Sequence, residues 1–219
     1  MVAKDLPMHQ KRRELAEPTR KAILDAAARL MAERGFEGTT VAALEKESGF
    51  PASSIYWHFS SKEGVLAAVM ERGAVQFLGG VEQRAWQAET AAEQVKRMFI
   101  QSGMELITDP EQAQFLQLQL RFRLNRQRHE GKAFYEVCDE VYRRGVEVMH
   151  RQIRAAYERH GAQMAENIAD KTGALAVAMI DGIYLSRRNS PVEETEMLLE
   201  GAATSLALLA DSFLPDREP

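Results

Sequence analysis

The segment TVAALEKESGFPASSIYWHFSSK, residues 40–62, constrains the fold of this chain more than any other part of it. Apolar residues recur at helical spacing on both sides of Gly49, namely Val41 and Leu44 before it and Ile55 and Phe59 after it. Gly49 supplies the permissive backbone that a sharp turn requires. The pattern therefore predicts two short helices joined by a turn, which is the helix-turn-helix arrangement.

The second predicted helix has another face, which carries small groups, hydroxyls and flat rings: Ala52, Ser53, Ser54, Tyr56, Trp57 and His58. A helix that enters the major groove of DNA needs small residues near its start for close approach, together with donors for phosphates and base edges. These residues are therefore candidates for DNA contact. Thr39, Thr40 and Lys62 are further candidates, because hydroxyls and positive charge near helix N-termini suit backbone phosphates.

The chain before this segment predicts a helix that starts at Pro18, since proline is tolerated in a first helical turn. Apolar residues continue this helix at helical spacing, namely Ile23, Leu24, Ala27, Leu30 and Met31. Gly35 is expected to end it, and the Thr40 hydroxyl to cap the next helix. Residues 1–17 contain a basic run but no sustained apolar stripe, so they are either a solvated tail or an arm that reaches DNA.

These residues stand at fixed offsets that resemble those of a known family. The chain from about Thr19 to Met70 is similar to the N-terminal DNA-binding domain of the TetR family of bacterial transcriptional regulators, and the residues that carry the resemblance are Thr19, Arg20, Ile23, Leu24, Ala26, Ala27, Gly35, Phe36, Thr39, Thr40, Gly49, Ile55, Tyr56, His58, Phe59 and Lys62. The resemblance implies that Tyr56 and His58 hold backbone phosphates and that the chain forms a homodimer. The sequence departs from the usual pattern at Pro51, where a serine cap is frequent, and at Glu45, where a small alanine is common.

The composition limits the class of protein. The net charge is −4, and residues 1–62 carry 10 Lys and Arg against 8 Asp and Glu, while the remainder carries 18 against 24. The acidic excess therefore lies outside the predicted DNA-binding part. The single cysteine, Cys138, cannot form an intrachain disulfide, which suits a reducing cytoplasm. The chain has no run of 18 apolar residues and no signal peptide, so we expect a cytoplasmic protein without a membrane partner.

Strand signals are almost absent, because no stretch alternates convincingly with β-branched residues, while Ala, Leu, Glu, Arg, Gln and Met are abundant. The sequence predicts an all-α protein of about nine helices. We expect a three-helix helix-turn-helix DNA-binding domain over residues 18–62, preceded by a basic arm over residues 1–17. A helical effector-binding and dimerisation domain is expected over residues 63–214, with a tail over residues 215–219.

The last two predicted helices are more apolar than one buried face requires. They are also rich in small residues, which include Ala174, Ala176, Ala178, Gly182, Gly201, Ala202, Ala203 and Ala207. Small residues let helices approach closely, so two copies of this pair would form a four-helix bundle. The family resemblance implies the same interface, and we therefore expect a homodimer through the last two helices.

The C-terminal part also holds methionines and large rings of the kind that line an apolar effector pocket, although each is individually typical of a core. The candidate effector-binding residues are Trp86, Phe99, Met104, Phe115, Phe122, Met149, Tyr157, Met179, Asp181 and Tyr184. A carboxylate inside an apolar helix, such as Asp181, needs a partner if it is buried, either a ligand or a group across the dimer. The arginine-rich run from Arg121 to Arg128 is either a solvated helical face or a site for an acidic effector.

The sequence thus predicts a sequence-specific DNA-binding transcriptional regulator. We expect a repressor, released from a pseudo-palindromic operator by a small, largely apolar effector. No HExxH, phosphate-binding glycine loop or Gly-x-Ser-x-Gly element occurs, and the His and Cys residues lack metal-site spacing, so no enzymatic activity, cofactor or metal is expected. Two alternatives remain open: a regulator without a small-molecule effector, controlled by a protein partner or by its level, and a helical ligand-binding protein with a vestigial DNA reader.

Overall fold

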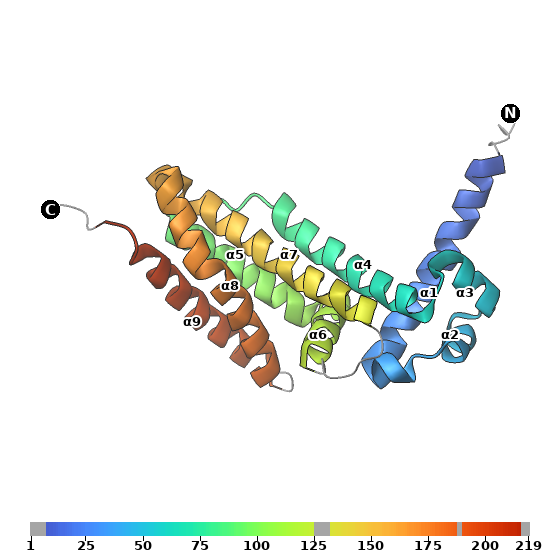
Figure 1. The fold of residues 1–219 in the computed structure, drawn as a ribbon. Coiled ribbons are helices and arrows are strands. Elements are labelled where there is room, and N and C mark those ends of the chain that lie inside the picture. The colour runs from blue at the N-terminus through green and yellow to red at the C-terminus, as the bar shows by residue number, and fades with distance from the viewer. Residues whose placement is uncertain (1–7, 125–131, 188–189, 216–219) are drawn as a thin grey trace, which may run out of the picture. The chain divides into compact units, whose positions relative to one another are not determined.

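Nine α-helices make up the described part of the chain in the computed structural model, which describes residues 8–124, 132–187 and 190–215. In chain order the elements are α1 (Met8–Gly38), α2 (Val41–Ser48), α3 (Ala52–Phe59), α4 (Lys62–Gln83), α5 (Ala91–Thr108), α6 (Pro110–Leu124), α7 (Lys132–Tyr157), the 3-10 helix η1 (Glu158–His160), α8 (Ala162–Arg187) and α9 (Val192–Asp211) (Figure 1). No residue of these ranges lies in a strand, so the predicted all-α class and helix number are confirmed.

Some predicted features involve residues that the structure does not describe. The structure does not describe residues 1–7 of the expected arm or residues 216–219 of the expected tail. Arg126 and Arg128 of the arginine-rich run also lie outside the described residues. Among the helices that are described, none is long and apolar enough to cross a membrane.

The chain divides into two compact units, which we describe separately. The first unit contains the chain as far as Arg72, together with the described residues at the start of α7 as far as Cys138. The second contains residues Gly73–Leu124 and the chain from Asp139 onward.

The first helix of the first unit begins earlier than the sequence predicts. Helix α1 starts at Met8 and contains Pro18 in its interior, so the prediction that Pro18 begins the helix is wrong. The preceding residues, MHQKRRELAE, include many strong helix formers, which extend the helix without an apolar stripe. Gly35 has a φ of 75° and interrupts the helical geometry, in agreement with the expected helix end.

Helices α2 and α3 pack beside one another over an apolar core. Leu44 and Ile55 are fully buried, as are Ile23 and Met31 of α1. The Thr40 hydroxyl accepts a hydrogen bond from the Ala43 N–H at 3.1 Å, which confirms the predicted cap of α2, and Gly49 ends α2 in the left-handed region, with a φ of 75°. This unit therefore fixes α3 by its buried face.

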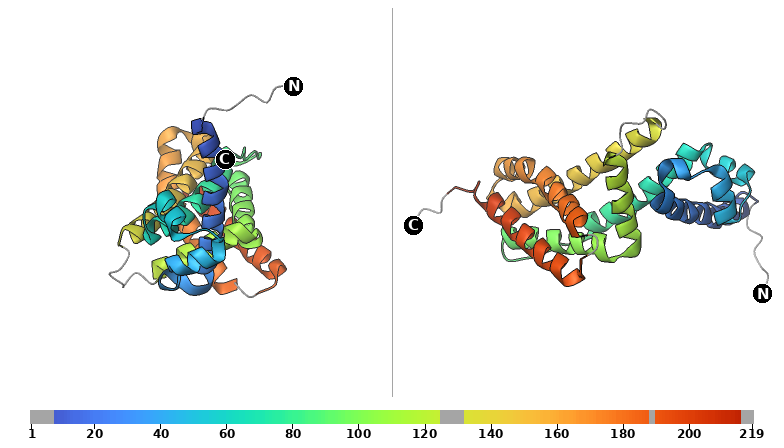
Figure 2. Two further views of the ribbon diagram at one scale, coloured as in Figure 1. Left: turned by 90° about the vertical axis from the view of Figure 1, so that its right-hand side faces the viewer. Right: turned by 90° about the horizontal axis from the view of Figure 1, so that it is seen from below.

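The second unit is a bundle in which α8 and α9 lie side by side (Figure 1 and the right-hand view of Figure 2). Helix α9 also packs against α5, where a Cβ at Gly103 would lie 2.6 Å from a methyl carbon of Leu199. At Gly173 in α8, an added Cβ would lie 3.1 Å from the Cα of His150 in α7. Glycine thus permits close helix approach at both contacts.

The turn between α3 and α4 depends on a further glycine. The Ser61 hydroxyl accepts a hydrogen bond from the Gly64 N–H at 3.1 Å, and a Cβ added at Gly64 would lie 2.1 Å from the carbonyl oxygen of Phe59. We expect Gly64→Ala to lower the free energy of unfolding by about 2–3 kcal/mol, because a backbone atom cannot move aside cheaply. Urea denaturation followed by circular dichroism measures this change.

The matched control for this prediction is Gly79→Ala in the same helix. A Cβ at Gly79 would meet only the Gln83 side-chain amide, at 4.0 Å. This substitution should raise the free energy of unfolding by about 0.5–1 kcal/mol, since alanine is the better helix former. Equal stabilities of the two variants would contradict the steric account of Gly64.

Candidate nucleic-acid interface and ligand cavity

Helix α3 has one buried face and one face open to solvent. Ile55 is fully buried and Phe59 is 8% exposed, whereas Tyr56 is 49% and Trp57 73% exposed. Ser53, on the first turn, is exposed as well. The predicted division of α3 into a core face and an accessible face is confirmed, and the accessible face presents two large rings with a polar atom each.

His58 lies at the edge of this face, half-buried beside Trp57. The two rings meet edge to face, with centroids 4.6 Å apart. Burial, together with the nearby positive charge of Arg20, lowers the pKa of His58 below its ordinary value, although Glu17 opposes the shift. His58 is therefore neutral near pH 7, with a ring nitrogen able to donate one hydrogen bond.

The start of α3 is capped by a side chain from α2. Pro51 occupies the N-cap position and makes no side-chain cap hydrogen bond. The carboxylate of Glu45 instead accepts a hydrogen bond from the Ala52 N–H at 2.6 Å. Both departures from the usual family pattern thus belong to one contact, in which an acid also meets the positive end of the helix dipole.

Two of the predicted DNA-contact residues have structural partners. Thr39 is fully buried and its hydroxyl donates to the Gly35 carbonyl at 2.7 Å, so the turn after α1 uses the side chain that was expected to contact DNA. The Lys62 ammonium donates to the Phe36 carbonyl at 3.2 Å and lies 4.2 Å from the centroid of the Phe36 ring. Sequence spacing did not reveal either partner, because both are set by how the chain turns between helices.

The other predicted DNA-contact residues lie near the exposed face of α3 or at the start of α2. Thr40 is exposed, and Ala52 and Ser54 are half-buried. The N-terminal unit therefore presents a compact set of hydroxyls, rings and one small residue. Such a set can donate hydrogen bonds to phosphates and approach base edges closely.

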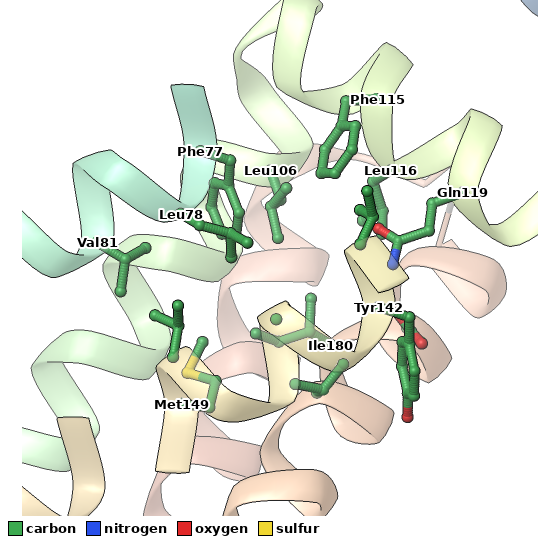
Figure 3. A pocket seen from close by; sticks show the side chains of 15 residues that line it. Phe77, Leu78, Val81, Leu106, Phe115, Leu116, Gln119, Tyr142, Met149 and Ile180 are labelled. Atoms are coloured by element: carbon green, nitrogen blue, oxygen red, sulfur yellow. The ribbon is translucent and has the colours of Figure 1, made fainter. Parts of the chain in front are cut away.

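The second unit contains a cavity with a volume of about 50 Å³, which is partly open to solvent. Its walls come from α4, α5, α6, α7 and α8, and Figure 3 shows the side chains around it. The lining residues are Phe77, Leu78, Val81, Leu106, Phe115, Leu116, Gln119, Val141, Tyr142, Gly145, Val148, Met149, Val177, Ile180 and Asp181. A mostly apolar cavity with a few polar groups is typical of small-molecule sites.

An ion pair lies at the polar side of this cavity. The Arg123 guanidinium donates to Oδ2 of Asp181 at 2.6 Å and lies 3.6 Å from the centroid of the Tyr142 ring. Burial raises the pKa of Asp181 above its ordinary value, although Arg123 favours the ionised form. The partner that the sequence required for Asp181 is therefore Arg123, within the same chain.

The structure brings only part of the predicted effector set to this cavity. Phe115, Met149 and Asp181 line it, whereas Tyr184 lines a separate cavity with Arg187 and Val192. The remaining predicted residues line neither of these cavities: Trp86, Phe99, Met104, Phe122, Tyr157 and Met179.

The aromatic residues that line neither cavity belong to the hydrophobic core. Phe99 and Tyr157 are fully buried, and the Tyr157 hydroxyl donates to Asp211 at 2.7 Å. The Trp86 N–H donates to the Val81 carbonyl at 3.1 Å. Aromatic or methionine identity alone does not separate a core position from a cavity wall.

Sequence reasoning missed Gln119 and Tyr142, the other polar side chains of the cavity. Both lie toward the same side in Figure 3, across from Leu78 and Val81. Gln119 lies one helical turn from Phe115 in α6, so its position on the same face was the available signal.

A histidine and two carboxylates meet between α7 and α8. His150 Nε2 lies 3.0 Å from Asp170 and 3.5 Å from Glu166, and their ligand-type atoms all lie within 4.8 Å of one another. Arg154 pairs with the other oxygen of Glu166 at 2.8 Å. These side chains form a polar network between α7 and α8, in which the Arg154 side chain already supplies a positive charge to Glu166.

The segment that builds the DNA-binding unit matches a known family. Residues 23–69 match the family model described as bacterial regulatory proteins, tetR family. The chain belongs to the TetR family. The match includes all of α3 and ends before Phe77, the first residue that lines the cavity. The family match therefore contains none of the residues that line the cavity of this TetR-family protein.

Individual relatives agree with this assignment. The chain is 34% identical to the HTH-type transcriptional regulator AcrR of Shigella flexneri over 64 residues, which cover 29% of this chain and 30% of AcrR. It is 27% identical to the HTH-type transcriptional regulator LmrA of Bacillus subtilis over 191 residues, which cover 78% of this chain and 89% of LmrA. The AcrR match thus spans less than a third of that relative.

A solved structure extends the likeness in fold to the second unit. The complex of SmeT, from Stenotrophomonas maltophilia, with triclosan has a TM-score of 0.67 and 24% sequence identity, and the match covers 92% of this chain and 99% of SmeT. At this identity the likeness shows that both units share the fold of SmeT.

The contact between Glu45 and the start of α3 yields a prediction for the DNA-binding unit. Glu45→Ala should lower the free energy of unfolding by about 1 kcal/mol, because it removes the only side-chain cap found at that helix end. Adding Pro51→Ser to the same chain should restore most of the loss, since serine is a strong N-cap residue.

Urea denaturation of the single and double variants measures both effects. Glu37→Ala is the matched control, because Glu37 is exposed on the same unit and should change stability little. A Glu45→Ala protein as stable as the Glu37→Ala protein, or a double variant without recovery, would count against the capping role.

Proposed function

We propose that this TetR-family protein is a transcriptional regulator that binds duplex DNA through the exposed face of α3. The observation that carries the proposal is the exposure of Tyr56 and Trp57 on a helix held by buried Ile55 and Phe59. Tyr and Trp are enriched at interfaces, because each ring combines a large apolar body with one polar atom. The named relatives AcrR and LmrA are transcriptional regulators, which supports the same conclusion.

The side chains of this face suit distinct parts of DNA. The hydroxyl of Tyr56 and a ring N–H of His58 would donate to phosphate oxygens, which position the protein without reading sequence. Ser53 and the small Ala52, at the start of α3, would lie closest to base edges in the major groove. Neither of these two residues makes a bidentate base contact, so DNA shape would contribute to specificity.

The exposed apolar side chains of α8 and α9 support a homodimer. Those more than a third exposed on these two helices are Leu175, Leu185, Val192, Met197, Leu198, Leu208 and Leu209. A Cβ added at Gly182 or Gly201 would meet nothing within 4 Å, so both helices also offer room for close approach. A two-fold dimer would match a pseudo-palindromic operator with half-sites about 34–36 Å apart or a multiple of that distance.

The cavity of the second unit supports control by a small molecule. Its apolar walls and single polar side suit a small, largely apolar effector. SmeT, which shares the fold, binds triclosan. We further propose that the protein is a repressor and that the effector favours a state with lower operator affinity, which requires unequal affinity for the two states.

Fluorescence anisotropy with labelled DNA from the region upstream of the gene tests the DNA-binding proposal. The wild-type protein should bind this duplex more tightly than a scrambled duplex, and affinity should fall steeply as salt rises. Tyr56→Phe should weaken binding to both duplexes about tenfold or more, because it removes a hydrogen bond to a charged group.

Tyr142→Phe is the matched control, since Tyr142 belongs to the second unit and should leave DNA affinity unchanged. Binding that ignores salt and the Tyr56 substitution would contradict the proposal.

Size-exclusion chromatography with light scattering tests the dimer. Leu208→Glu, at a side chain 67% exposed on α9, should give a monomer, because the partner helix would bury an unpaired charge. Val75→Glu is the control, since Val75 is 60% exposed on α4, and this variant should remain dimeric. A dimeric Leu208→Glu protein, or a monomeric wild type, would overturn the interface.

A further inference from the structure

We propose that the cavity of the second unit selects an effector with an apolar body and a polar end that donates hydrogen bonds and carries no negative charge. This inference rests on the proposed effector site and specifies its chemistry. The ends of the cavity differ, because polar side chains gather on one side, where Gln119 and Tyr142 lie in Figure 3.

The carboxylate of the ion pair faces the cavity, and the guanidinium does not line it. Asp181 is a lining residue, whereas Arg123 is not. Oδ2 of Asp181 accepts from Arg123 at 2.6 Å, and the guanidinium itself lies against the Tyr142 ring. A ligand that reaches the polar side therefore meets a carboxylate before it meets the guanidinium, and an anion would be repelled there.

The polar side of the cavity has hydrogen-bonding capacity that the protein itself does not use. Within the described residues, Oδ1 of Asp181 and the side-chain amide of Gln119 have no hydrogen-bond partner. The Asp181 side chain is 16% exposed, so its Oδ1 is a partly buried acceptor at the cavity. Two oxygens, one carboxylate and one amide, are thus available to a ligand donor.

The net charge of the ion pair also affects which ligand can bind. The Arg123–Asp181 pair is neutral as a whole, so a neutral donor such as a hydroxyl can bind without burying an unpaired charge. An ammonium group can also donate to both oxygens. A hydrocarbon without a donor gains binding free energy only from contact with the apolar walls. When it displaces water, it leaves these acceptors without hydrogen bonds.

Four probes with one naphthyl ring separate these possibilities. They are 1-naphthylmethanol, 1-naphthylmethylamine, 1-naphthoate and naphthalene, and isothermal titration calorimetry with the full-length protein measures their affinities. We expect the alcohol and the amine to bind at least about tenfold more tightly than naphthoate and naphthalene. Naphthoate as the tightest probe, naphthalene equal to the alcohol, or no binding by any probe would overturn the inference.

Two substitutions assign the selectivity to named groups. Gln119→Leu should reduce the ratio of the affinities for 1-naphthylmethanol and naphthalene, because it removes one of the two acceptor oxygens at similar size. Asp181→Asn keeps an oxygen acceptor but loses the charge, so it should weaken the amine and strengthen naphthoate. Gln163→Leu, at an exposed glutamine of α8 outside this cavity, is the matched control and should change no affinity. An unchanged ratio of the affinities for 1-naphthylmethanol and naphthalene in Gln119→Leu would overturn the assignment.

Anisotropy with upstream DNA, repeated with each probe at saturation, separates this inference from the proposed function. If the probes bind in the expected order while DNA affinity stays constant, the ligand selectivity holds and the effector role fails. If the probes do not bind but the protein still binds DNA selectively, the DNA-binding function holds and the selectivity inference is overturned.

Discussion

The burial of Ile55 and Phe59 holds the exposed face of α3 in place, and the other features of the DNA-binding unit depend on it. Each of these side chains contributes about 2–3 kcal/mol when it leaves water. Their burial requires α3 to point the intervening residues, Tyr56 and Trp57, outward. The cap from Glu45 then fixes the start of the same helix, so the face is held at its N-terminal end and along its length.

Local patterns made most of the fold predictable, but contacts between elements were not predictable in the same way. The helical spacing of the apolar residues predicted the helices. The Thr40 cap was predictable because its partner, the Ala43 N–H, lies only a few residues along the chain. Glu45 was difficult to place because its partner lies across the turn, and Thr39 because its burial depends on α1. The cavity draws on five helices, so a ring such as Phe99 was indistinguishable from Phe115 until the packing was known.

The pair of Arg123 and Asp181 shows why a charged residue persists in an apolar bundle. Burying a carboxylate is costly, and the guanidinium compensates only one of its oxygens. A core without ligand function would be served as well by apolar residues of similar volume. The pair instead leaves a polar side to an otherwise apolar cavity, which is the feature that gives the second unit chemical selectivity.

The fluorescence of Trp57 tests the central claim, that the exposed face of α3 contacts DNA, most directly. The chain has 2 tryptophans, so Trp86→Phe leaves Trp57 as the only one, and its ring is 73% exposed in the free protein. When duplex DNA from the upstream region saturates this variant, we predict a change in emission and protection from acrylamide quenching. Emission and quenching that stay unchanged, while anisotropy shows the DNA bound, would contradict the account.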